Sequence, residues 1–398
     1  MSDTTANVSK VKPDTRRKGY RQFSSQAKSQ LNPKEFVERL AALRGADSFV
    51  QLSVRNKELF GKIQASYQKI VDGQELCKED YLLSGHELDE VRSIPDDKIP
   101  RYVAYRYKYN KYPELKIANE YPPCVQIEPA SICNYRCVMC YQIDKSFSSK
   151  SKGHMGLMEL EVFKHAVDEL QGNVEAVTLA SRGEPFLNSK LLEMLEYAKG
   201  KFLALKLNTN ASLLTEKAVH ALLSSDIQTL VFSVDSADPE TYERIRVNGN
   251  YDRVRKNIEM FQKIRTQDYA QSKIITKISG VKLNDDQDID TLVDSWQELV
   301  DQVAFVHYNP WESAYENPEN TIQEPCSELW RRMFLWWDGR VNPCDFDYKS
   351  TLTENTDIHF PEKTLQEIWM SDLYLNMRQK HLAAQRDQLF PCNRCVSV

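Results

Sequence analysis

The sequence lacks any long run of apolar residues. Its first twenty residues, MSDTTANVSKVKPDTRRKGY, contain no apolar segment like the core of a secretory signal. No other stretch reaches the uninterrupted apolar length that a membrane-spanning helix requires. We therefore expect neither secretion through such a signal nor a place in a membrane, and the predicted location is the cytoplasm.

An excess of positive charge is also missing. The chain has 52 Lys and Arg against 57 Asp and Glu, a formal net charge of −5. Because nucleic acid attracts proteins with a positive surface, this balance argues against nucleic acid as a partner. The chain has 398 residues, of which 41% are hydrophobic. It is therefore long enough for a large domain with appendages, built around a sizeable core.

Disulfides are not expected among the nine cysteines, because the cytoplasm keeps thiols reduced. Clustered cysteines in that compartment more often bind metal or take part in chemistry. Seven of the nine fall into two groups, Cys133, Cys137 and Cys140 in the loop SICNYRCVMCYQ, and Cys326, Cys344, Cys392 and Cys395 near the C-terminus. The other two, Cys77 and Cys124, are predicted to be buried structural thiols.

The chain divides by pattern into four parts. Residues 1–30 are polar and basic and predict a disordered tail. Residues 31–120 predict a helical N-terminal extension, whose first helix begins with Asn32 as its cap and Pro33 in its first turn. Within this part, the stretch RYVAYRYKYNKYPEL alternates tyrosine with Arg and Lys. That period of two predicts an edge strand with buried tyrosines, in preference to a phosphate clamp.

The third part, residues 121–310, alternates apolar strand patterns with helical patterns. Six such repeats predict a parallel sheet with right-handed crossovers, whose active groups gather at the carboxyl ends of the strands. The predicted strands are 124–129, 174–180, 202–208, 229–235, 273–280 and 302–308. The fourth part, residues 311–398, starts with a polar linker and contains a predicted hairpin that turns at Asp338 and Gly339.

The loop with three cysteines follows the first predicted strand directly. Three thiolates do not complete a tetrahedral zinc site, but they fit three corners of a 4Fe–4S cluster and leave one iron open to another ligand. A zinc loop with a distant fourth ligand, or three incidental thiols, are the alternatives. The position at a strand end of a six-repeat series favours the cluster.

Cys-x3-Cys-x2-Cys after the first strand resembles the hallmark of the radical S-adenosylmethionine (radical SAM) superfamily. The resemblance implies an α/β fold with a partial (β/α)6 barrel over residues 121–310, and a 4Fe–4S cluster that binds SAM. It also implies that Glu184 of the segment SRGEP receives the ammonium group of SAM, that Ser233 and Asp235 face the ribose, and that Arg246 meets the carboxylate. The full implied cofactor-binding set is Met139, Gly183, Glu184, Asn208, Asn210, Ser233, Asp235 and Arg246.

Two positions depart from the superfamily's pattern. Arg182 stands where the first glycine of a Gly-Gly-Glu-Pro segment is usual, and Ala211 stands where a turn glycine is usual.

The C-terminal cysteines form a second complete set. Two lie on the predicted hairpin and two in the closing Cys-x2-Cys, and four thiolates suit either zinc or an iron–sulfur cluster. Their order resembles the SPASM/twitch extension of many radical SAM enzymes. That resemblance implies an auxiliary 4Fe–4S cluster held by Cys326, Cys344, Cys392 and Cys395 in a small domain over residues 311–398.

The resemblance also implies a reaction. A flavodoxin- or ferredoxin-like donor supplies an electron, SAM is cleaved reductively to a 5′-deoxyadenosyl radical, and the radical abstracts hydrogen from the substrate. The first hypothesis is net oxidation of a small hydroxyl-rich substrate, such as a sugar, nucleotide sugar or aminocyclitol, with the auxiliary cluster accepting the electron. The second is a peptide- or protein-modifying maturase, and the third is a non-catalytic iron–sulfur or zinc scaffold.

Two observations bear on the choice between these hypotheses. Residues 31–80 read as helices and lack the strand pattern of a peptide-recognition module, which favours a small molecule. The segment HYNPWES after the last strand offers His307, Tyr308, Asn309 and Trp311 as substrate-facing groups. A tryptophan that packs under the linker is the alternative for Trp311.

Overall fold

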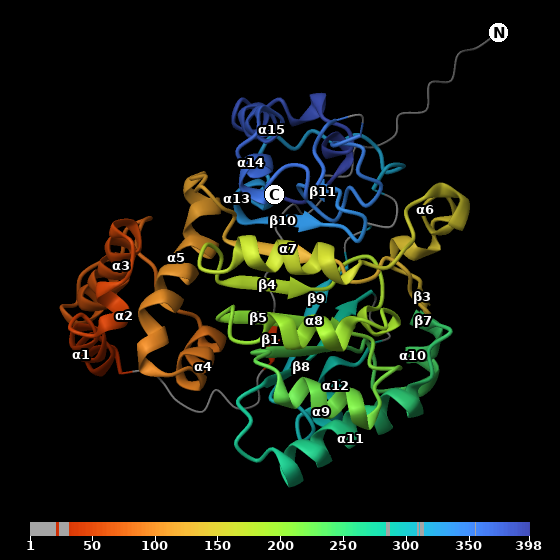
Figure 1. Ribbon diagram of the computed structural model, residues 1–398, viewed down its shortest axis with the longest axis horizontal. Coiled ribbons are helices and arrows are strands. Elements are labelled where there is room, and N and C mark those ends of the chain that lie inside the picture. The colour runs from red at the N-terminus through yellow and green to blue at the C-terminus, as the bar shows by residue number, and fades with distance from the viewer. Residues whose placement is uncertain (1–20, 24–31, 284–286, 309, 311–313, 355) are drawn as a thin grey trace.

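The computed structural model describes residues 21–23, 32–283, 287–308, 310, 314–354 and 356–398. Its centre is a curved, mostly parallel sheet with helices on its outer face (Figure 1). The six parallel strands predicted between residues 124 and 308 are confirmed. They are β2 (Cys124–Ile127), β4 (Ala176–Leu179), β5 (Ala204–Thr209), β6 (Thr229–Ser233), β8 (Ile275–Lys282) and β9 (Gln302–His307).

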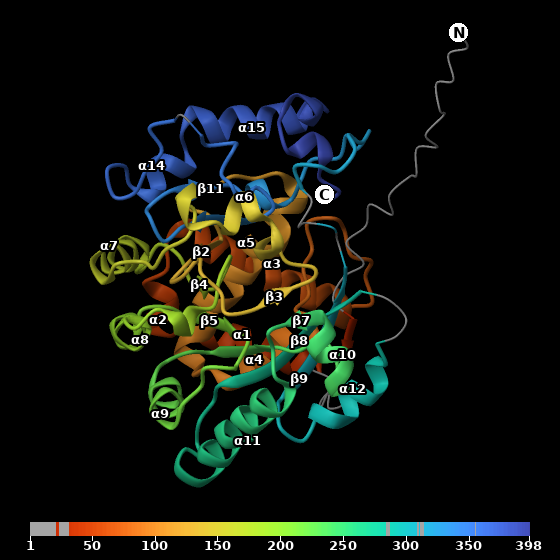
Figure 2. The same cartoon turned by 90° about the vertical axis from the view of Figure 1, so that its right-hand side faces the viewer.

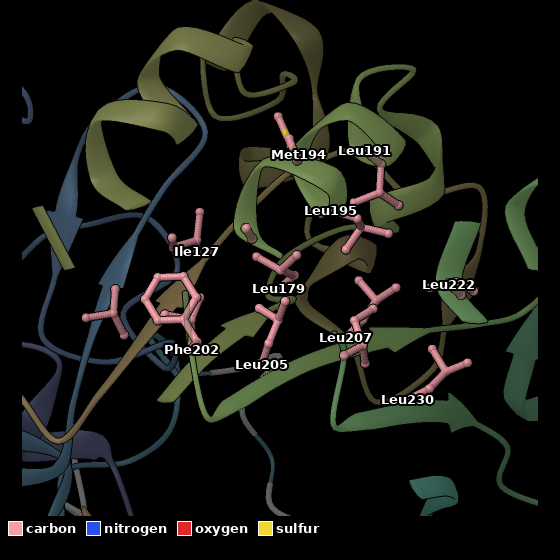
Figure 3. Close-up of a cluster of buried hydrophobic side chains, with 14 of the residues drawn as sticks. Ile127, Leu179, Leu191, Met194, Leu195, Phe202, Leu205, Leu207, Leu222 and Leu230 are labelled. Carbon is pink, nitrogen blue, oxygen red and sulfur yellow. The ribbon is translucent and has the colours of Figure 1, made fainter. Parts of the chain in front are cut away.

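The helices between these strands cover the outside of the partial barrel. They are α7 (Leu160–Leu170), α8 (Leu191–Ala198), α9 (Glu216–Ser224), α10 (Pro239–Ile245), α11 (Tyr251–Asp268) and α12 (Ile289–Trp296). One residue in two along β4, β5 and β6 points toward these helices, as Leu179, Leu205 and Leu230 do in Figure 3. The apolar core therefore lies between the sheet and its outer helices, and the alternate residues face the interior of the barrel.

The C-terminal part of the chain extends the same sheet. Strand β10 (Arg332–Leu335) pairs in parallel with β2, and β11 (Val341–Asn342) pairs with β10 in the predicted hairpin. Gly339 turns the hairpin with a φ of +90°, a conformation that favours glycine. Helices α13 (Glu328–Arg331), α14 (Leu365–Trp369) and α15 (Asp372–Leu382) complete this part.

The N-terminal helices close the amino-terminal end of the barrel, on the left of Figure 1. They are α1 (Pro33–Leu43), α2 (Asp47–Val50), α3 (Val54–Val71), α4 (Gly85–Ser93) and α5 (Ile99–Leu115). Their apolar cluster includes Cys124, Ala176 and Leu203, which lie at the amino-terminal ends of the strands. None of the helices in the described ranges combines the length and apolar character that crossing a membrane requires.

Three predictions about this half of the molecule are wrong. The tyrosine-rich stretch is not an edge strand but helix α5. Tyr102, Tyr105 and Tyr107 are all buried, so the helix is buried on more than one face. Its sequence therefore lacks the repeat of about 3.6 residues that marks a helix with a single apolar face. Within the tail predicted to be disordered, residues 21–23 form strand β1 (Arg21–Phe23), antiparallel to β9. Cys77 is exposed, whereas Cys124 is buried as predicted.

Candidate cluster and cofactor site

The loop with three cysteines crosses the carboxyl ends of the strands (Figure 2). Its short strand β3 (Arg136–Cys137) pairs antiparallel with β7 (Arg246–Val247), so that Cys137 lies opposite Arg246. The Val138 N–H donates to the Ile245 carbonyl at 3.0 Å, next to this pair. Residues more than a hundred positions apart in the sequence therefore hold the loop over the mouth of the barrel.

The three cysteines share one small cluster of side chains. Cys137 packs among Tyr135, Met139 and Ile245, and Cys133 and Cys140 pack against the same group. Burial raises the pKa of all three thiols, that of Cys133 to about 12, so the chain alone favours their neutral form. Bound iron stabilises thiolates. Three thiols gathered in a dry site of this kind fit three ligands of a cluster.

Gly183 lies directly under the start of this loop. A Cβ at Gly183 would stand 2.2 Å from the Ile132 carbonyl oxygen and 2.5 Å from that of Ala130. The neighbouring Glu184 N–H donates to the same Ile132 carbonyl at 2.8 Å. The loop that follows β4 therefore supports the cysteine loop by backbone contact that leaves no room for a side chain.

Glu184 is buried, and its carboxylate accepts three hydrogen bonds. The donors are the Thr209 hydroxyl at 2.7 Å, the Asn210 N–H at 2.7 Å and the Phe186 N–H at 3.2 Å. Burial raises the pKa of Glu184, against the opposing effect of these donors. Since an ionised carboxylate has about four acceptor positions, one position remains for a further donor.

Asp235 and Arg246 form a buried ion pair beside the cysteines. Arg246 Nε lies 2.7 Å from Asp235 Oδ2, and Arg246 Nη1 lies 3.8 Å from the Cys137 sulfur. The other oxygen of Asp235 accepts the Val281 N–H at 2.8 Å. Asp235 is therefore already paired inside the protein. The guanidinium of Arg246 joins that carboxylate to the cysteine loop.

The other residues of the predicted cofactor set differ in their surroundings. Asn210 donates to Asn134 Oδ1 at 3.0 Å and accepts from the Ser212 hydroxyl at 2.7 Å, so it ties the loop after β5 to the cysteine loop. Asn208 and Ser233 face the barrel interior and are partly exposed, and Asn208 Oδ1 has no hydrogen-bond donor among the described residues. Ala211 adopts the turn conformation of a glycine, with φ +61°.

The predicted substrate-facing residues are placed only in part. Tyr308 packs against the same small cluster as the three cysteines, and its N–H donates to the Lys282 carbonyl at 3.1 Å. His307 is the last residue of β9, and Asn309 and Trp311 lie outside the described residues.

The four C-terminal cysteines line a single cavity, which also includes His381 and Arg386. Arg386 is buried, and its guanidinium donates to the carbonyls of Cys392 and Cys395, at 3.1 and 2.8 Å from Nη2. Burial raises the pKa of Cys326 to about 11, and burial also raises the pKa of Cys344 and Cys392. The cavity therefore brings together four thiols from distant segments, the donor set of a cubane.

Within the described ranges, no three His, Cys, Asp or Glu side chains stand close enough to share one metal ion. The four thiolates of a cubane each bind a different iron, so such a cluster does not require them to converge on one point.

The barrel interior, which the motif analysis did not assign, is polar and partly exposed. Along β5 the outward residues are buried and the inward residues Ala204, Lys206 and Asn208 are partly exposed, the reverse of a packed barrel core. Along β8, the inward residues Ile275, Lys277 and Ser279 show the same pattern. We call this interior the lumen. The alternation of Lys206 and Asn208 with leucines in a buried parallel strand was the signal for it in the sequence.

Two family models match the chain. Residues 127–294 match the Radical SAM superfamily, and residues 326–396 match SPASM, an iron–sulfur cluster-binding domain.

Relatives and solved structures show the same likeness. The chain is 29% identical over 143 residues to an AdoMet-dependent heme synthase of Methanosarcina barkeri, over 36% of this chain and 40% of the relative. It is 26% identical over 156 residues to the mycofactocin maturase MftC of Mycolicibacterium smegmatis, over 39% of this chain and 38% of the relative. The chain thus spans about two fifths of the curated relatives' length. Streptococcus suis SuiB, bound to precursor peptide SuiA, shares the fold, with a TM-score of 0.52 and 17% identity over 78% of each chain.

Proposed function

Because the chain is a member of the radical SAM superfamily with a C-terminal SPASM domain, we propose that it oxidises a small hydroxyl-rich substrate by hydrogen abstraction. The substrate class is a sugar, nucleotide sugar or aminocyclitol. When bound, the first cluster and SAM supply a hydrogen-abstracting radical, and the auxiliary cluster supplies an acceptor for the remaining electron.

The roles of the protein's own residues follow from their positions. Cys133, Cys137 and Cys140 would hold the first cluster, and Cys326, Cys344, Cys392 and Cys395 would hold the second. Glu184 accepts from Thr209 and Asn210, and its remaining acceptor position would receive the SAM ammonium group. Arg246, already paired with Asp235 on one side, would meet the SAM carboxylate. The loop that these residues support covers the barrel mouth and would exclude water.

The lumen is the observation that carries the choice of substrate. Its walls offer amide, hydroxyl and ammonium groups from Gln126, Thr178, Lys206, Asn208, Ser233, Lys277 and Ser279. These groups can form hydrogen bonds to the hydroxyls of a ligand. The N-terminal helices pack against the far end of the strands. Polar groups of this kind, on strands whose far end is covered, suit a compact polyol better than an extended peptide.

A peptide-modifying activity is the second candidate. It is supported by the similarity of 39% of the chain to a mycofactocin maturase. A peptide would have to reach the barrel mouth from outside, past the cysteine loop and the C-terminal domain.

We further propose a flavodoxin- or ferredoxin-like electron donor and a cytoplasmic location. Two thiolate-bound clusters need a compartment in which thiols stay reduced.

The proposal is tested on the anaerobically reconstituted full chain with SAM and dithionite. C-deuterated sugars and cyclitols are offered one at a time, and methionine, 5′-deoxyadenosine and the organic product are measured by mass spectrometry. We expect deuterium to move into 5′-deoxyadenosine, and a product that has lost two hydrogen atoms. In that balance, one hydrogen goes to 5′-deoxyadenosine, one proton goes to solvent and one electron goes to the auxiliary cluster.

The matched control is the Cys133→Ala/Cys137→Ala/Cys140→Ala variant, in which SAM cleavage should disappear. Wild-type protein that binds both clusters yet never forms 5′-deoxyadenosine would be a scaffold. Deuterium transfer from a labelled peptide but from no polyol would establish the second candidate instead.

A further inference from the structure

We propose that the lumen binds an anionic group of the substrate, a phosphate or a carboxylate, between Lys206 of β5 and Lys277 of β8. This inference rests on the proposed function, since it takes the lumen as the substrate chamber. It narrows the substrate class from a polyol to an anionic polyol.

The strand register sets the two lysines on the same inner wall. Lys206 lies beside Thr178 on one side and Thr229 on the other, and Lys277 lies beside Val231. Both side chains face inward, because the outward residues between them, Leu205, Leu207 and Ile278, belong to the core under the helices. Only β6 separates β5 from β8, so the two strands are about 10 Å apart, and the register sets Lys277 level with Asn208, one inward position nearer the mouth than Lys206. The flexible four-carbon stems of two lysines can converge on one group across that distance.

The ammonium group of Lys206 has its electrostatic neighbours toward the closed end of the barrel. Burial lowers the pKa of Lys206, and Arg332 and Arg106 act in the same direction from that end. Burial also lowers the pKa of His86 in α4, and Lys277 contributes to this effect. The electrostatic neighbours of the two lysines thus include residues of the amino-terminal helices, which places the anion site in the deep part of the lumen.

The nearby carboxylates are engaged elsewhere. Glu90 is in an ion pair with Arg106 of α5. Glu328 is in an ion pair with Arg332 at 2.9 Å. Among the residues that the structure describes, no carboxylate lies within ion-pair distance of Lys206. An enclosed ammonium group without a counter-charge is costly, and an anionic ligand would remove that cost.

The groups beside and above the lysines suit the rest of such a ligand. Asn208 lies one inward position nearer the mouth than Lys206 and level with Lys277, and Ser279 lies one inward position nearer the mouth than Lys277. Ser233 lies beside Ser279 in the register. These amide and hydroxyl groups can bind hydroxyls between the anion and the cysteine loop. The anionic end would enter first, which leaves the reacting carbon near the mouth.

The test is equilibrium dialysis of the reconstituted full chain against radiolabelled inorganic phosphate, a probe that needs no turnover and no knowledge of the sugar. We expect one saturable phosphate per chain in the wild type, and at least about tenfold weaker binding in Lys206→Met and in Lys277→Met. Lys206→Arg, which keeps the charge, should retain binding. The matched control is Lys199→Met, because Lys199 is exposed on the outer surface after α8.

Phosphate or gluconate that binds equally to the wild type and both Met variants would overturn the proposal, and so would a wild type that binds neither anion. Separate dialysis against radiolabelled gluconate distinguishes the two sources of charge. If gluconate binds at this site and phosphate does not, the group is a carboxylate. If phosphate binds but SAM is not cleaved, the anion site is supported and the proposed function is wrong. If deuterium moves from a neutral sugar to 5′-deoxyadenosine and no anion binds, the proposed function holds and the anion site is wrong.

Discussion

Arg182 and Glu128 form an ion pair whose side chains are both fully buried, with 2.5 Å between Arg182 Nη2 and Glu128 Oε2. Arg182 Nε donates to the other oxygen at 2.7 Å, and Arg182 Nη1 donates to the Tyr348 carbonyl at 2.8 Å. The guanidinium also lies over the ring of Trp336, 4.1 Å from its centre. Burial alone would lower the pKa of Arg182, but Glu128 outweighs that effect and raises it. Arg182, which stands where the superfamily's pattern usually has a glycine, therefore joins the barrel to the C-terminal domain.

Arg182→Met should destabilise the protein by about 3–5 kcal/mol, because it leaves the Glu128 carboxylate buried without a partner. The measurement is the free energy of unfolding from anaerobic urea titration. The double variant Arg182→Met/Glu128→Gln, which buries no charge, should recover much of the loss. The exposed pair Lys190 and Glu193 is the matched control, and Lys190→Met should cost about 0.5 kcal/mol or less. If Arg182→Met and Lys190→Met lower the free energy of unfolding equally, burial of the Arg182–Glu128 pair does not explain the loss.

Gly183→Ala should displace the cysteine loop. The new methyl would meet the Ile132 carbonyl, a backbone atom that cannot turn aside, so the cost falls at the upper end of about 1–3 kcal/mol for overpacking. We expect slower SAM cleavage together with a lower free energy of unfolding. Gly85→Ala is the control, since a Cβ at Gly85 meets nothing within 4 Å. If Gly183→Ala matches the wild type in both measurements, the close contact between Gly183 and the Ile132 carbonyl does not hold the cysteine loop in place.

Iron and sulfide counts should show two independent clusters. Wild type should hold about eight irons after anaerobic reconstitution, and Cys133→Ala/Cys137→Ala/Cys140→Ala about four. Cys392→Ala/Cys395→Ala should also fall to about four, because it removes half of the thiols that line the C-terminal cavity. Zinc in the first variant in place of the second set of irons would make the C-terminal site structural. It would also remove the electron acceptor from the proposed oxidation.

The sequence was sufficient to predict the barrel strands, because each is a short apolar run between a turn and an amphipathic helix. It also predicted the hairpin at Gly339, since the Asp-Gly turn requires only local geometry. The parallel pairing of β10 with β2 was not predictable, because Arg332 and Cys124 are more than two hundred residues apart and no local pattern reports such a pairing.

Burial of helix α5 on several faces explains why this stretch was wrongly predicted to be a strand. Helix α5 buries Tyr102, Tyr105 and Tyr107 as well as Arg106, whose charge is met by Glu87 and Glu90 of α4. A buried ion pair makes an arginine look like a surface residue in the sequence, so the alternation appeared to be a two-sided strand. The same difficulty hid the partner of Arg182, because nothing local to Glu128 marks it as the other half of a buried pair.

His154 should give the protein a pH dependence between about pH 6.5 and pH 4. Burial lowers the pKa of His154 to about 4, with Arg340 and Arg182 adding to the effect. The unfolded chain therefore binds the proton at a higher pH than the folded chain, so stability is complete above about pH 6.5 and decreases as the pH falls toward 4. The ring is partly exposed, so we expect a loss of about 1 kcal/mol of folding stability between pH 7 and pH 5.

Anaerobic calorimetry of His154→Gln should show a smaller drop in Tm over that interval than the wild type shows. The control is His165→Gln, at a position on the outer helix α7, and its drop in Tm should equal that of the wild type. Equal drops in the wild type and His154→Gln would mean that His154 is protonated in the folded protein as readily as in the unfolded chain.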